Sequence, residues 1–240
     1  MDEAATSEAS KLPDEVCADA FIVIAAYNED VCLDEVVREV RDRYPNVVVI
    51  DDGSTDHTYR VAKRCATYTL RHVINRGQGA ALQTGIEFAL SQGARYIVTF
   101  DADGQHDVDD IASMVEPISR GEVEVTLGSR FLGGAKGIPF SRRMMLRMAV
   151  LFTRLVSRVE VTDAHNGFRA FSAEAASRIH ITLDRMAHAS ELIDQIRHCG
   201  LPFREVPVHI RYTDYSLRKG QSSRGAIQIV IHYLLARVLP

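Results

Sequence analysis

Short apolar runs rich in β-branched residues alternate with helical segments along the first hundred residues, and this alternation restricts the fold more than any other feature. Strands are expected at 21–26, 47–50, 67–73 and 96–100. Helices are expected at 31–44, 58–66 and 80–92. Strands that alternate with helices of about 10 to 15 residues form βαβ units. We therefore expect an α/β fold with a mostly parallel central sheet flanked by helices.

The composition is that of one globular domain without a general affinity for nucleic acid. The chain has 240 residues, of which 46% are hydrophobic, with a formal net charge of −4 and a pI near 6.1. This length favours a single core, and the slightly acidic balance argues against a general nucleic-acid binder. Four scattered cysteines without a CxxC pair argue against a disulfide framework or a zinc site, so we expect a reducing compartment.

The sequence predicts a cytoplasmic protein that is either free or peripheral on the cytoplasmic face of a membrane. The acidic first residues lack the apolar core of a signal peptide. No apolar run reaches the ~18 residues that a bilayer span requires. Residues 138–159 combine apolar side chains with five arginines, which suits an interfacial helix on anionic lipid, a core-facing helix or a dimer surface.

The second half of the chain continues with strands and helices but is richer in loops. Strands are expected at 123–128 and 203–210, and a loop at 162–171 should run into another strand. Glycine-rich or basic loops are expected at 131–139 and 212–223, and helices at 142–159, 173–179, 188–199 and 227–238. Residues 1–18 are expected to form a polar tail, and 19–240 one domain.

Three expected strands are followed by acidic or glycine-rich loops, at Asp51-Asp52, at Asn75–Gly79 and at Asp101–Asp103. The carboxyl ends of parallel strands meet at one edge of the sheet, where ligands bind in open α/β folds. The three loops should therefore form one polar crevice. Asp101 and Asp103 offer hard oxygen ligands for Mg²⁺ or Mn²⁺; alternatively, they form a polar turn in which an aspartate caps a helix.

The other two loops also admit a functional and a structural interpretation. A carboxylate of Asp51-Asp52 can recognise a nucleoside, or the segment is a helix start capped by Ser54 or Asp56. The loop Asn75–Gly79 places Arg76 and two glycines before a helix N-terminus, where backbone amides favour anions. This loop matches neither the dinucleotide GxGxxG motif nor the GxxxxGK[ST] phosphate loop.

Short motifs follow one another in the order AAYNED, VVVIDDGSTDHT, NRGQGAALQTGIEFA, YIVTFDADGQH, LGSRF, TDAHNGFRAF, EVPV and YSLRKGQS. Over about residues 21–223, their order and spacing resemble family-2 glycosyltransferases of the GT-A fold, and most of all the dolichol-phosphate mannose synthase-like, polyprenyl-phosphate group. The resemblance implies a Rossmann-like GT-A fold, a nucleotide-sugar donor, Mg²⁺ or Mn²⁺, and inversion at the anomeric carbon. It divides the domain into a nucleotide-sugar half at 19–107, an acceptor half at 108–222 and a C-terminal amphipathic helix at 223–240.

The resemblance also implies roles for residues around the donor. Asp101, Asp103 and Gln105 would hold the metal against the donor diphosphate, with Asp103 also close to the transferred sugar. The late basic loop would fold over the diphosphate; its alternative interpretation is a solvated surface loop. The residues expected to bind the donor are Ala26, Tyr27, Glu29, Asp51, Asp52, Arg76, Gly79, Asp101, Arg218, Lys219 and Ser222.

For the acceptor, Ser129 and Arg130 match positions that bind a lipid phosphate, and Arg143 is a candidate second ligand; a solvated helix face is the alternative for these arginines. A phosphate acceptor is already ionised and needs positioning cations, whereas a hydroxyl acceptor needs a general base. Asp163 matches a family position proposed as base, or it forms an Asx-type turn. Arg169 could brace the site through a carboxylate.

The function expected from these residues is metal-dependent, inverting transfer of a hexose from a UDP- or GDP-sugar to a polyprenyl phosphate. One alternative is transfer to a hydroxyl acceptor in cell-surface polysaccharide synthesis. Another is a non-catalytic nucleotide-binding subunit of a membrane complex, which would not need both Asp101 and Asp103. A nucleotidyltransferase would need a glycine-rich, lysine-containing loop that the sequence lacks. Many relatives carry C-terminal membrane spans, whereas the expected helix at 227–238 is too short to cross.

Overall fold

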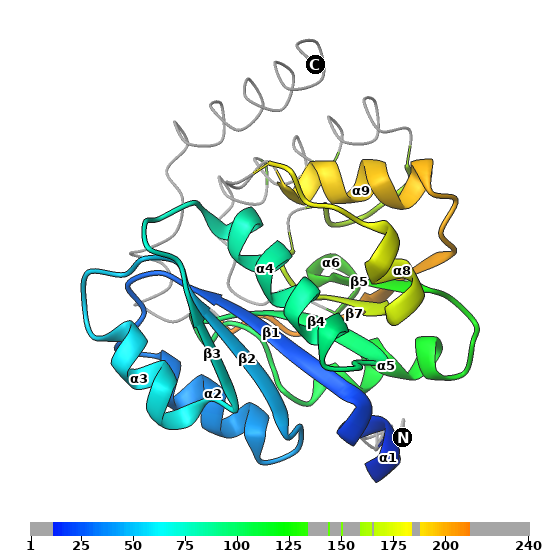
Figure 1. The fold of residues 1–240 in the computed structure, drawn as a ribbon. Helices are drawn as coiled ribbons and strands as arrows, with labels where there is room; N and C mark the ends of the chain where they lie inside the picture. Colours follow the sequence, from blue (N-terminus) through cyan, green and yellow to red (C-terminus); the bar gives the residue numbers. More distant parts are fainter. Residues whose placement is uncertain are drawn as a thin grey trace.

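A seven-stranded sheet lies between two layers of helices in the computed structural model, with strand order β3-β2-β1-β4-β6-β5-β7 (Figure 1). The structure describes residues 12–133, 144, 150, 159–164, 166–183 and 188–211. The strands are β1 Ala20–Ala26, β2 Asn46–Asp51, β3 Tyr68–Arg71, β4 Tyr96–Asp101, β5 Val125–Ser129, β6 Arg169–Ser172 and β7 Phe203–Pro207.

Every strand of this sheet except β6 points the same way. β1, β2, β3 and β4 are parallel neighbours, whereas β6 is antiparallel to both β4 and β5, and β7 is parallel to β5. The prediction of a mostly parallel sheet is therefore confirmed. The loops that follow the parallel strands share one edge with the loop that precedes β6, because β6 begins at that edge.

Alternate side chains of the central strands belong to two separate cores. On β1, Ile22 and Ile24 pack on the side of α2, α3 and α5, whereas Phe21 and Val23 pack on the side of α4, α8 and α9. The helices are α1 Asp14–Asp19, α2 Leu33–Arg41, α3 Thr58–Cys65, α4 Gln78–Ser91, α5 Asp110–Ser119, α6 Arg130–Gly133, α8 Ala173–Arg178 and α9 His188–His198. Strands buried on both faces explain the continuous apolar runs of the sequence.

Close packing of α4 on the sheet depends on a glycine within that helix. A Cβ atom at Gly85 would lie 2.4 Å from Val23 Cγ1 and 2.5 Å from Ile50 Cδ1. A larger residue would therefore push the helix away from β1 and β2. This packing places the N-terminus of α4 beside the loops that follow β2 and β4.

Three expectations from the sequence need correction. Residues 14–18, expected in the tail, belong to α1, because Leu12 is buried and Val16 and Cys17 pack against the core. Helix α5 was not predicted; its Ile111, Met114 and Val115 are fully buried. The loop expected at 131–139 begins inside the short helix α6. The expected helix at 142–159, apart from Met144, Val150 and Val159, the loop at 212–223 and the helix at 227–238 lie outside the described residues.

Over the described ranges, none of the helices combines the length and the apolar character that crossing a bilayer requires.

Candidate active site

The turn after β2 is fixed by its two aspartates. Asp52 is buried, and its Oδ1 and Oδ2 accept hydrogen bonds from the backbone N–H groups of Arg76 (2.9 Å) and Gly77 (2.6 Å). Asp51 is also buried; its Oδ1 accepts from Ser54 N, and its Oδ2 lies 3.0 Å from Arg71 Nε. The two carboxylates therefore hold the β2 turn against the loop between β3 and α4.

A glycine allows these two loops to approach each other. Gly53 has a φ of +70°, in the left-handed region that favours glycine. A Cβ atom there would lie 2.6 Å from the carbonyl carbon of Ile74 and 2.7 Å from Asn75 N. Any larger residue would separate the β2 turn from the loop that carries Arg76.

The loop after β1 is joined to the β2 turn by side-chain hydrogen bonds. Asn28, at a positive φ of 54°, donates its N–H to Ser54 Oγ and accepts from Thr55 N. Glu29 N donates to Thr58 Oγ1 at 2.8 Å. Ala26 is buried at the end of β1, and Tyr27 is 43% exposed. The residues expected at the nucleoside site therefore lie on two connected loops at the carboxyl edge of the sheet.

The carboxylate at the end of β4 is held by two side chains from different loops. Asp101 Oδ1 accepts from Gln78 Nε2 at 3.1 Å, and its Oδ2 lies 2.9 Å from His106 Nε2. Burial raises the pKa of Asp101, but the His106 hydrogen bond and electrostatic attraction from His106, His188 and Arg130 outweigh it, so the pKa is lower than usual. The lowered pKa favours the ionised form of the Asp101 carboxylate.

Asp103 lies close enough to Asp101 for the two carboxylates to repel each other. Burial and the Asp101 charge raise the pKa of Asp103 from an ordinary 3.8 to about 6. The backbone N–H of Gln105 donates to Asp103 Oδ1 at 3.0 Å. The described residues contain no group of three or more His, Cys, Asp and Glu side chains arranged for a metal. Two adjacent carboxylates nevertheless suit Mg²⁺ or Mn²⁺, which completes its shell with substrate phosphates and water.

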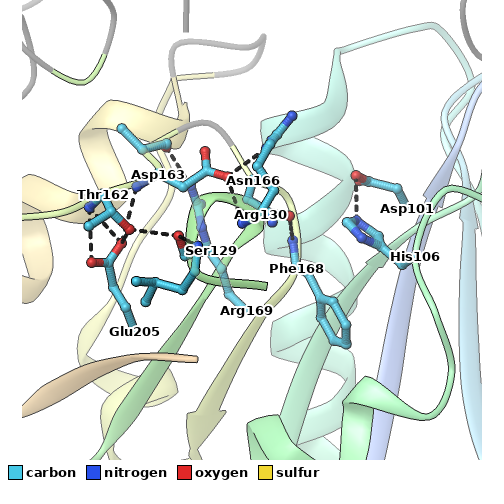
Figure 2. Close-up of polar contacts among 12 residues, drawn as sticks. Asp101, His106, Ser129, Arg130, Thr162, Asp163, Asn166, Phe168, Arg169 and Glu205 are labelled. Atoms are coloured by element: carbon cyan, nitrogen blue, oxygen red, sulfur yellow. Dashed lines mark hydrogen bonds and ion pairs between the residues drawn. The ribbon is translucent and has the colours of Figure 1, made fainter. Parts of the chain in front are cut away.

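His106 supports Asp101 from within an aromatic cluster. Its ring lies 5.3 Å from the Phe100 ring and 4.9 Å from the Phe168 ring, and it is buried. Figure 2 shows the imidazole directed at Asp101. Its Nδ1 is buried and has no hydrogen-bond partner among the described residues. Because the two phenyl rings hold the imidazole in place, its contact through Nε2 fixes the orientation of the Asp101 carboxylate.

Two residues expected on the acceptor side, Arg130 and Asp163, form a buried ion pair (Figure 2). Asp163 Oδ2 accepts from Arg130 Nε at 2.6 Å and from Arg130 N at 3.2 Å, and both side chains are more than 90% buried. The other oxygen, Asp163 Oδ1, is buried without a hydrogen-bond partner among the described residues. The predicted phosphate ligand and the predicted base are therefore direct partners.

Glu205 on β7 organises the segment that carries Asp163. Its carboxylate accepts hydrogen bonds from Thr162 N at 2.7 and 2.9 Å, from Thr162 Oγ1 at 2.9 Å and from Asp163 N at 3.1 Å. Thr162 Oγ1 also lies 2.6 Å from Ser129 Oγ. Ser129 is completely buried, so a direct contact between its hydroxyl and an acceptor would require a rearrangement.

The loop before β6 packs directly on the Asp101 carboxylate. Thr99 Oγ1 donates to Gly167 O at 2.7 Å. A Cβ atom at Gly167 would lie 2.5 Å from Asp101 Oδ1, so only glycine permits this approach. Asn166 Oδ1 accepts from Phe168 N, while its Nδ2 is buried without a hydrogen-bond partner in the described part of the chain. The residues expected to bind the donor and those expected to bind the acceptor therefore meet at Asp101.

A buried arginine lies between the two carboxylate groups. Arg169 is 3% exposed, and its guanidinium donates to the carbonyl oxygens of Ala164 and Ala189. Burial lowers the pKa of Arg169 to about 10, although Asp101 and Asp163 act in the opposite direction. The guanidinium therefore remains charged near neutral pH, and it interacts electrostatically with both carboxylates.

The structure brings most of the predicted site residues to one edge of the sheet. Gly79 lies in the first turn of α4, beside the Arg76 loop. Arg143, Arg218, Lys219 and Ser222 lie outside the described residues. Sequence reasoning assigned no role to Gln78, His106, Thr162, Asn166 or Glu205, although each lies inside one of the quoted motifs. Their position inside the motifs was a signal that the sequence offered. Their hydrogen-bond partners, which show what each residue does, could be learned only from the structure.

The arrangement of sheet, loops and paired acidic residues is that of a GT-A glycosyltransferase. The model of the family "Glycosyl transferase family 2" matches residues 21–179. The chain belongs to glycosyl transferase family 2. The predicted family and fold class are thereby confirmed.

Curated relatives match over most of the chain. The UDP-N-acetylglucosamine–dolichyl-phosphate N-acetylglucosaminyltransferase of Methanococcus voltae is 30% identical, over 91% of this chain and 96% of the relative. The undecaprenyl-phosphate mannosyltransferase of Micrococcus luteus is 27% identical, over 85% and 88%. Both relatives are named for transfer to a polyprenyl phosphate.

A solved structure supports the fold. Glucosyl-3-phosphoglycerate synthase from Mycobacterium tuberculosis, in complex with Mg²⁺ and UDP, superposes with a TM-score of 0.69. The sequence identity is 18%, and the match covers 97% of this chain and 84% of that one. At this identity the likeness concerns the fold alone.

Proposed function

We propose that the chain transfers a hexose from a UDP- or GDP-hexose to a polyprenyl phosphate. The observation that carries the proposal is the convergence at Asp101, where the donor loops and the acceptor loop are in direct contact. The names of the relatives from Methanococcus voltae and Micrococcus luteus support a lipid-phosphate acceptor. With such an acceptor, the reaction is proposed to take place at the cytoplasmic face of a membrane, on the lipid surface or beside a membrane protein.

In this proposal the loops after β1 and β2 bind the nucleoside. Ala26, Tyr27 and Glu29 are proposed to line one side and Asp52 the other, with the fully buried Asp51 in a supporting role. The loop with Arg76 and Gly79 continues into the N-terminus of α4, where the backbone N–H groups of the first helical turn favour an anion such as the diphosphate. Arg218, Lys219 and Ser222 are proposed to complete the diphosphate site.

Asp101, Asp103 and Gln105 are proposed to hold a divalent metal ion. When bound, Mg²⁺ or Mn²⁺ would stabilise the negative charge that develops on the leaving nucleoside diphosphate. His106 and Gln78 hold the Asp101 carboxylate in one orientation. The pKa of Asp103 is raised in the metal-free protein, and a bound cation would favour its ionised form.

The acceptor half favours a phosphate over a hydroxyl acceptor. Asp163 Oδ2 accepts hydrogen bonds from both the backbone N and the Nε of Arg130, so this oxygen already serves to hold the arginine. Asp163 is therefore better placed to hold Arg130 than to remove a proton. An ionised phosphate needs no base, and Arg130 with Arg143 is proposed to position it for attack. A hydroxyl acceptor remains the second candidate because Asp163 Oδ1 has no hydrogen-bond partner among the described residues.

The test is transfer of radiolabelled hexose to matched lipid acceptors. Purified protein with Mn²⁺ or Mg²⁺ is incubated with UDP- or GDP-hexoses and either a polyprenyl phosphate or the same polyprenol without phosphate. The proposal expects organic-phase label only with the phosphate and only with active metal. Label on the free polyprenol, or only in water-soluble product, would instead support the hydroxyl acceptor.

A further inference from the structure

We infer that Arg211 is a positioning residue for the two carboxylates that follow β4, and that it acts on them through their neighbours. The inference rests on the proposed function and adds to it a residue that no motif argument selected. Arg211 ends a segment, residues 208–211, that continues the chain beyond β7 and that we call the β7 extension. Val208 and Ile210 are buried, whereas His209 and Arg211 are exposed, which is the alternation of an extended segment.

The two carboxylates are oriented by consecutive residues of one turn. The backbone N–H of Gln105 donates to Asp103 Oδ1 at 3.0 Å, and His106 Nε2 lies 2.9 Å from Asp101 Oδ2. The first contact comes from the backbone itself, and the second comes from a side chain that the backbone places. A shift of the backbone at these two residues would therefore disturb both carboxylates.

The β7 extension pairs with the backbone of the same two residues. Arg211 N donates to Gln105 O at 2.8 Å, and His106 forms an antiparallel bridge with Ile210. Gln105 thus connects Arg211 to Asp103, because its carbonyl oxygen accepts from one and its N–H donates to the other. Short two-stranded pairings are marginally stable in water, so this one depends on the side-chain contacts around it.

The Arg211 side chain supplies such a contact at the next residue of the turn. Its Nη2 donates to Asp107 Oδ2 at 2.7 Å, and its Nη1 lies 3.9 Å from Glu39 Oε1 on α2. Asp107 Oδ1 accepts from Asp109 N at 3.1 Å, which ties the same carboxylate to the residue before α5. Arg211 therefore holds the turn through its backbone and its side chain together.

The β7 extension is itself fixed at its start, so it can support the turn. Val208 N donates to Ser129 O at 3.2 Å, and a Cβ atom at Gly133 would lie 2.2 Å from Val208 O. In the middle of the extension, the buried Asp110 of α5 accepts from His209 N at 2.5 Å. Arg211 therefore joins the turn to a segment that is held by β5 and α5.

Amide hydrogen exchange in the metal-free full chain tests this support. We expect the amides of Gln105 and Arg211 to be protected in the wild type. Arg211→Gln and Asp107→Asn should each speed their exchange about three- to fivefold, the upper range for an exposed ion pair. The double variant should exchange no faster than either single variant, because both changes remove the same contact. Equal exchange in the wild type and the variants would overturn the inference.

Binding of Mn²⁺ tests the consequence for the site. Its Kd is measured by electron paramagnetic resonance with excess UDP or GDP, without acceptor and without turnover. Arg211→Gln and Asp107→Asn should raise this Kd about three- to fivefold, and Arg211→Lys should keep most of the affinity because it keeps the charge. Arg204→Gln breaks a similarly exposed ion pair with Glu122, and as the matched control it should leave the Kd unchanged.

The outcomes separate this inference from the proposed function. A lower Tm for both Arg211→Gln and Arg204→Gln, with an unchanged Kd for Mn²⁺, would show that Arg211 only stabilises the fold and would overturn the positioning role. If the wild-type chain binds no Mn²⁺ with either nucleotide, the proposed metal-dependent function fails, whereas hydrogen exchange still decides whether Arg211 holds the turn.

Discussion

The donor and acceptor halves each place a buried aspartate at the same edge of the sheet, but the two carboxylates are bound differently. Asp52 has a hydrogen-bond partner on each oxygen, from backbone N–H groups of the neighbouring loop. Asp163 has Arg130 on Oδ2, whereas its buried Oδ1 has no hydrogen-bond partner within the described ranges. Asn166, on the same loop as Asp163, leaves its buried Nδ2 unbonded there as well.

For these two loops, the difference indicates that the turn held by Asp52 is organised before substrate binds, whereas the loop of Asp163 and Asn166 is completed by its ligand. The donor half also contains His106 Nδ1, which is buried without a hydrogen-bond partner in the described part of the chain. A buried polar atom without a hydrogen bond costs about 1–3 kcal/mol, so it persists where a ligand pairs with it. The loops of the donor half follow parallel strands and hold one another. The acceptor loop precedes the antiparallel β6 and depends on Glu205 of β7 for its conformation.

Asp101 lies in the donor half but also contacts the acceptor loop at Gly167, so its substitution should have the largest effect. Asp101→Asn keeps the shape but removes the charge proposed to hold the metal, and we expect kcat/KM to fall about 1,000-fold or more. Radiolabelled transfer at saturating metal measures the loss. Asp42→Asn, at an exposed position, is the matched control. Activity within tenfold of the wild type would remove Asp101 from the metal site.

Gly167→Ala tests the contact that joins the two halves. The new Cβ would lie 2.5 and 2.7 Å from the Asp101 oxygens, so the carboxylate has to move while the backbone can stay. We expect about a 10- to 100-fold loss of kcat/KM with little change in Tm, since small misplacements at a reacting centre are costly.

Thr99→Val tests the same contact with a smaller change, because it removes the hydrogen bond to Gly167 O without adding bulk. Its loss of activity should be smaller than that of Gly167→Ala. A fall in Tm that parallels the loss of activity in both variants would mean that the contact is only structural.

Glu205→Gln should weaken acceptor binding without changing donor binding, and so distinguish the two halves. The amide oxygen of the glutamine can replace only one carboxylate oxygen. Its NH2 group cannot accept the hydrogen bond that Thr162 N donates to Oε2, and the negative charge is lost, so the acceptor loop should shift. We expect about a tenfold higher KM for the acceptor with an unchanged Kd for the nucleoside diphosphate, measured by initial rates and calorimetry. Glu122→Gln, which removes only a surface ion pair with Arg204, is the control. An equal loss of nucleotide affinity would contradict independent halves.

The sequence allowed the prediction of those elements whose local pattern matches their final environment. The apolar, β-branched runs of β1, β2 and β4 predict buried strands, and the runs of β2 and β4 end abruptly in Asp51 and Asp101. The type of these elements and the position of the site could therefore be predicted from the sequence. The four-residue β6 lies antiparallel between β4 and β5 because of tertiary packing, which no local pattern reveals. Pro117 near the end of α5 obscured that helix.

Side-chain partners were the least predictable part of the site. Gln78 reaches Asp101 only because α4 packs over the sheet, and Arg130 meets Asp163 only because β5 and β6 are neighbours. These contacts join residues that are distant in sequence. The motifs placed the residues in the site, but the packing decided which of them became partners.

The smallest expected effect concerns Asp103 in metal-free protein. Its pKa of about 6 in the folded state exceeds the ordinary 3.8, so between these values the folded chain holds a proton that the unfolded chain has released. The free energy of unfolding should therefore fall as pH rises from about 4 to 6, by about 3 kcal/mol at most, and stay low above pH 6.

Asp103→Asn lacks this titration, so in chelator at pH 7 it should melt several degrees above the wild type, with the gap closing near pH 4. Thermal unfolding from pH 4 to 8 measures the difference, with Asp42→Asn as the control. Added Mn²⁺ should raise the Tm of the wild type more than that of Asp103→Asn, because only the aspartate pair offers two charges to the ion. A wild-type Tm that exceeds that of Asp103→Asn at pH 7 in chelator would contradict mutual repulsion of the two carboxylates.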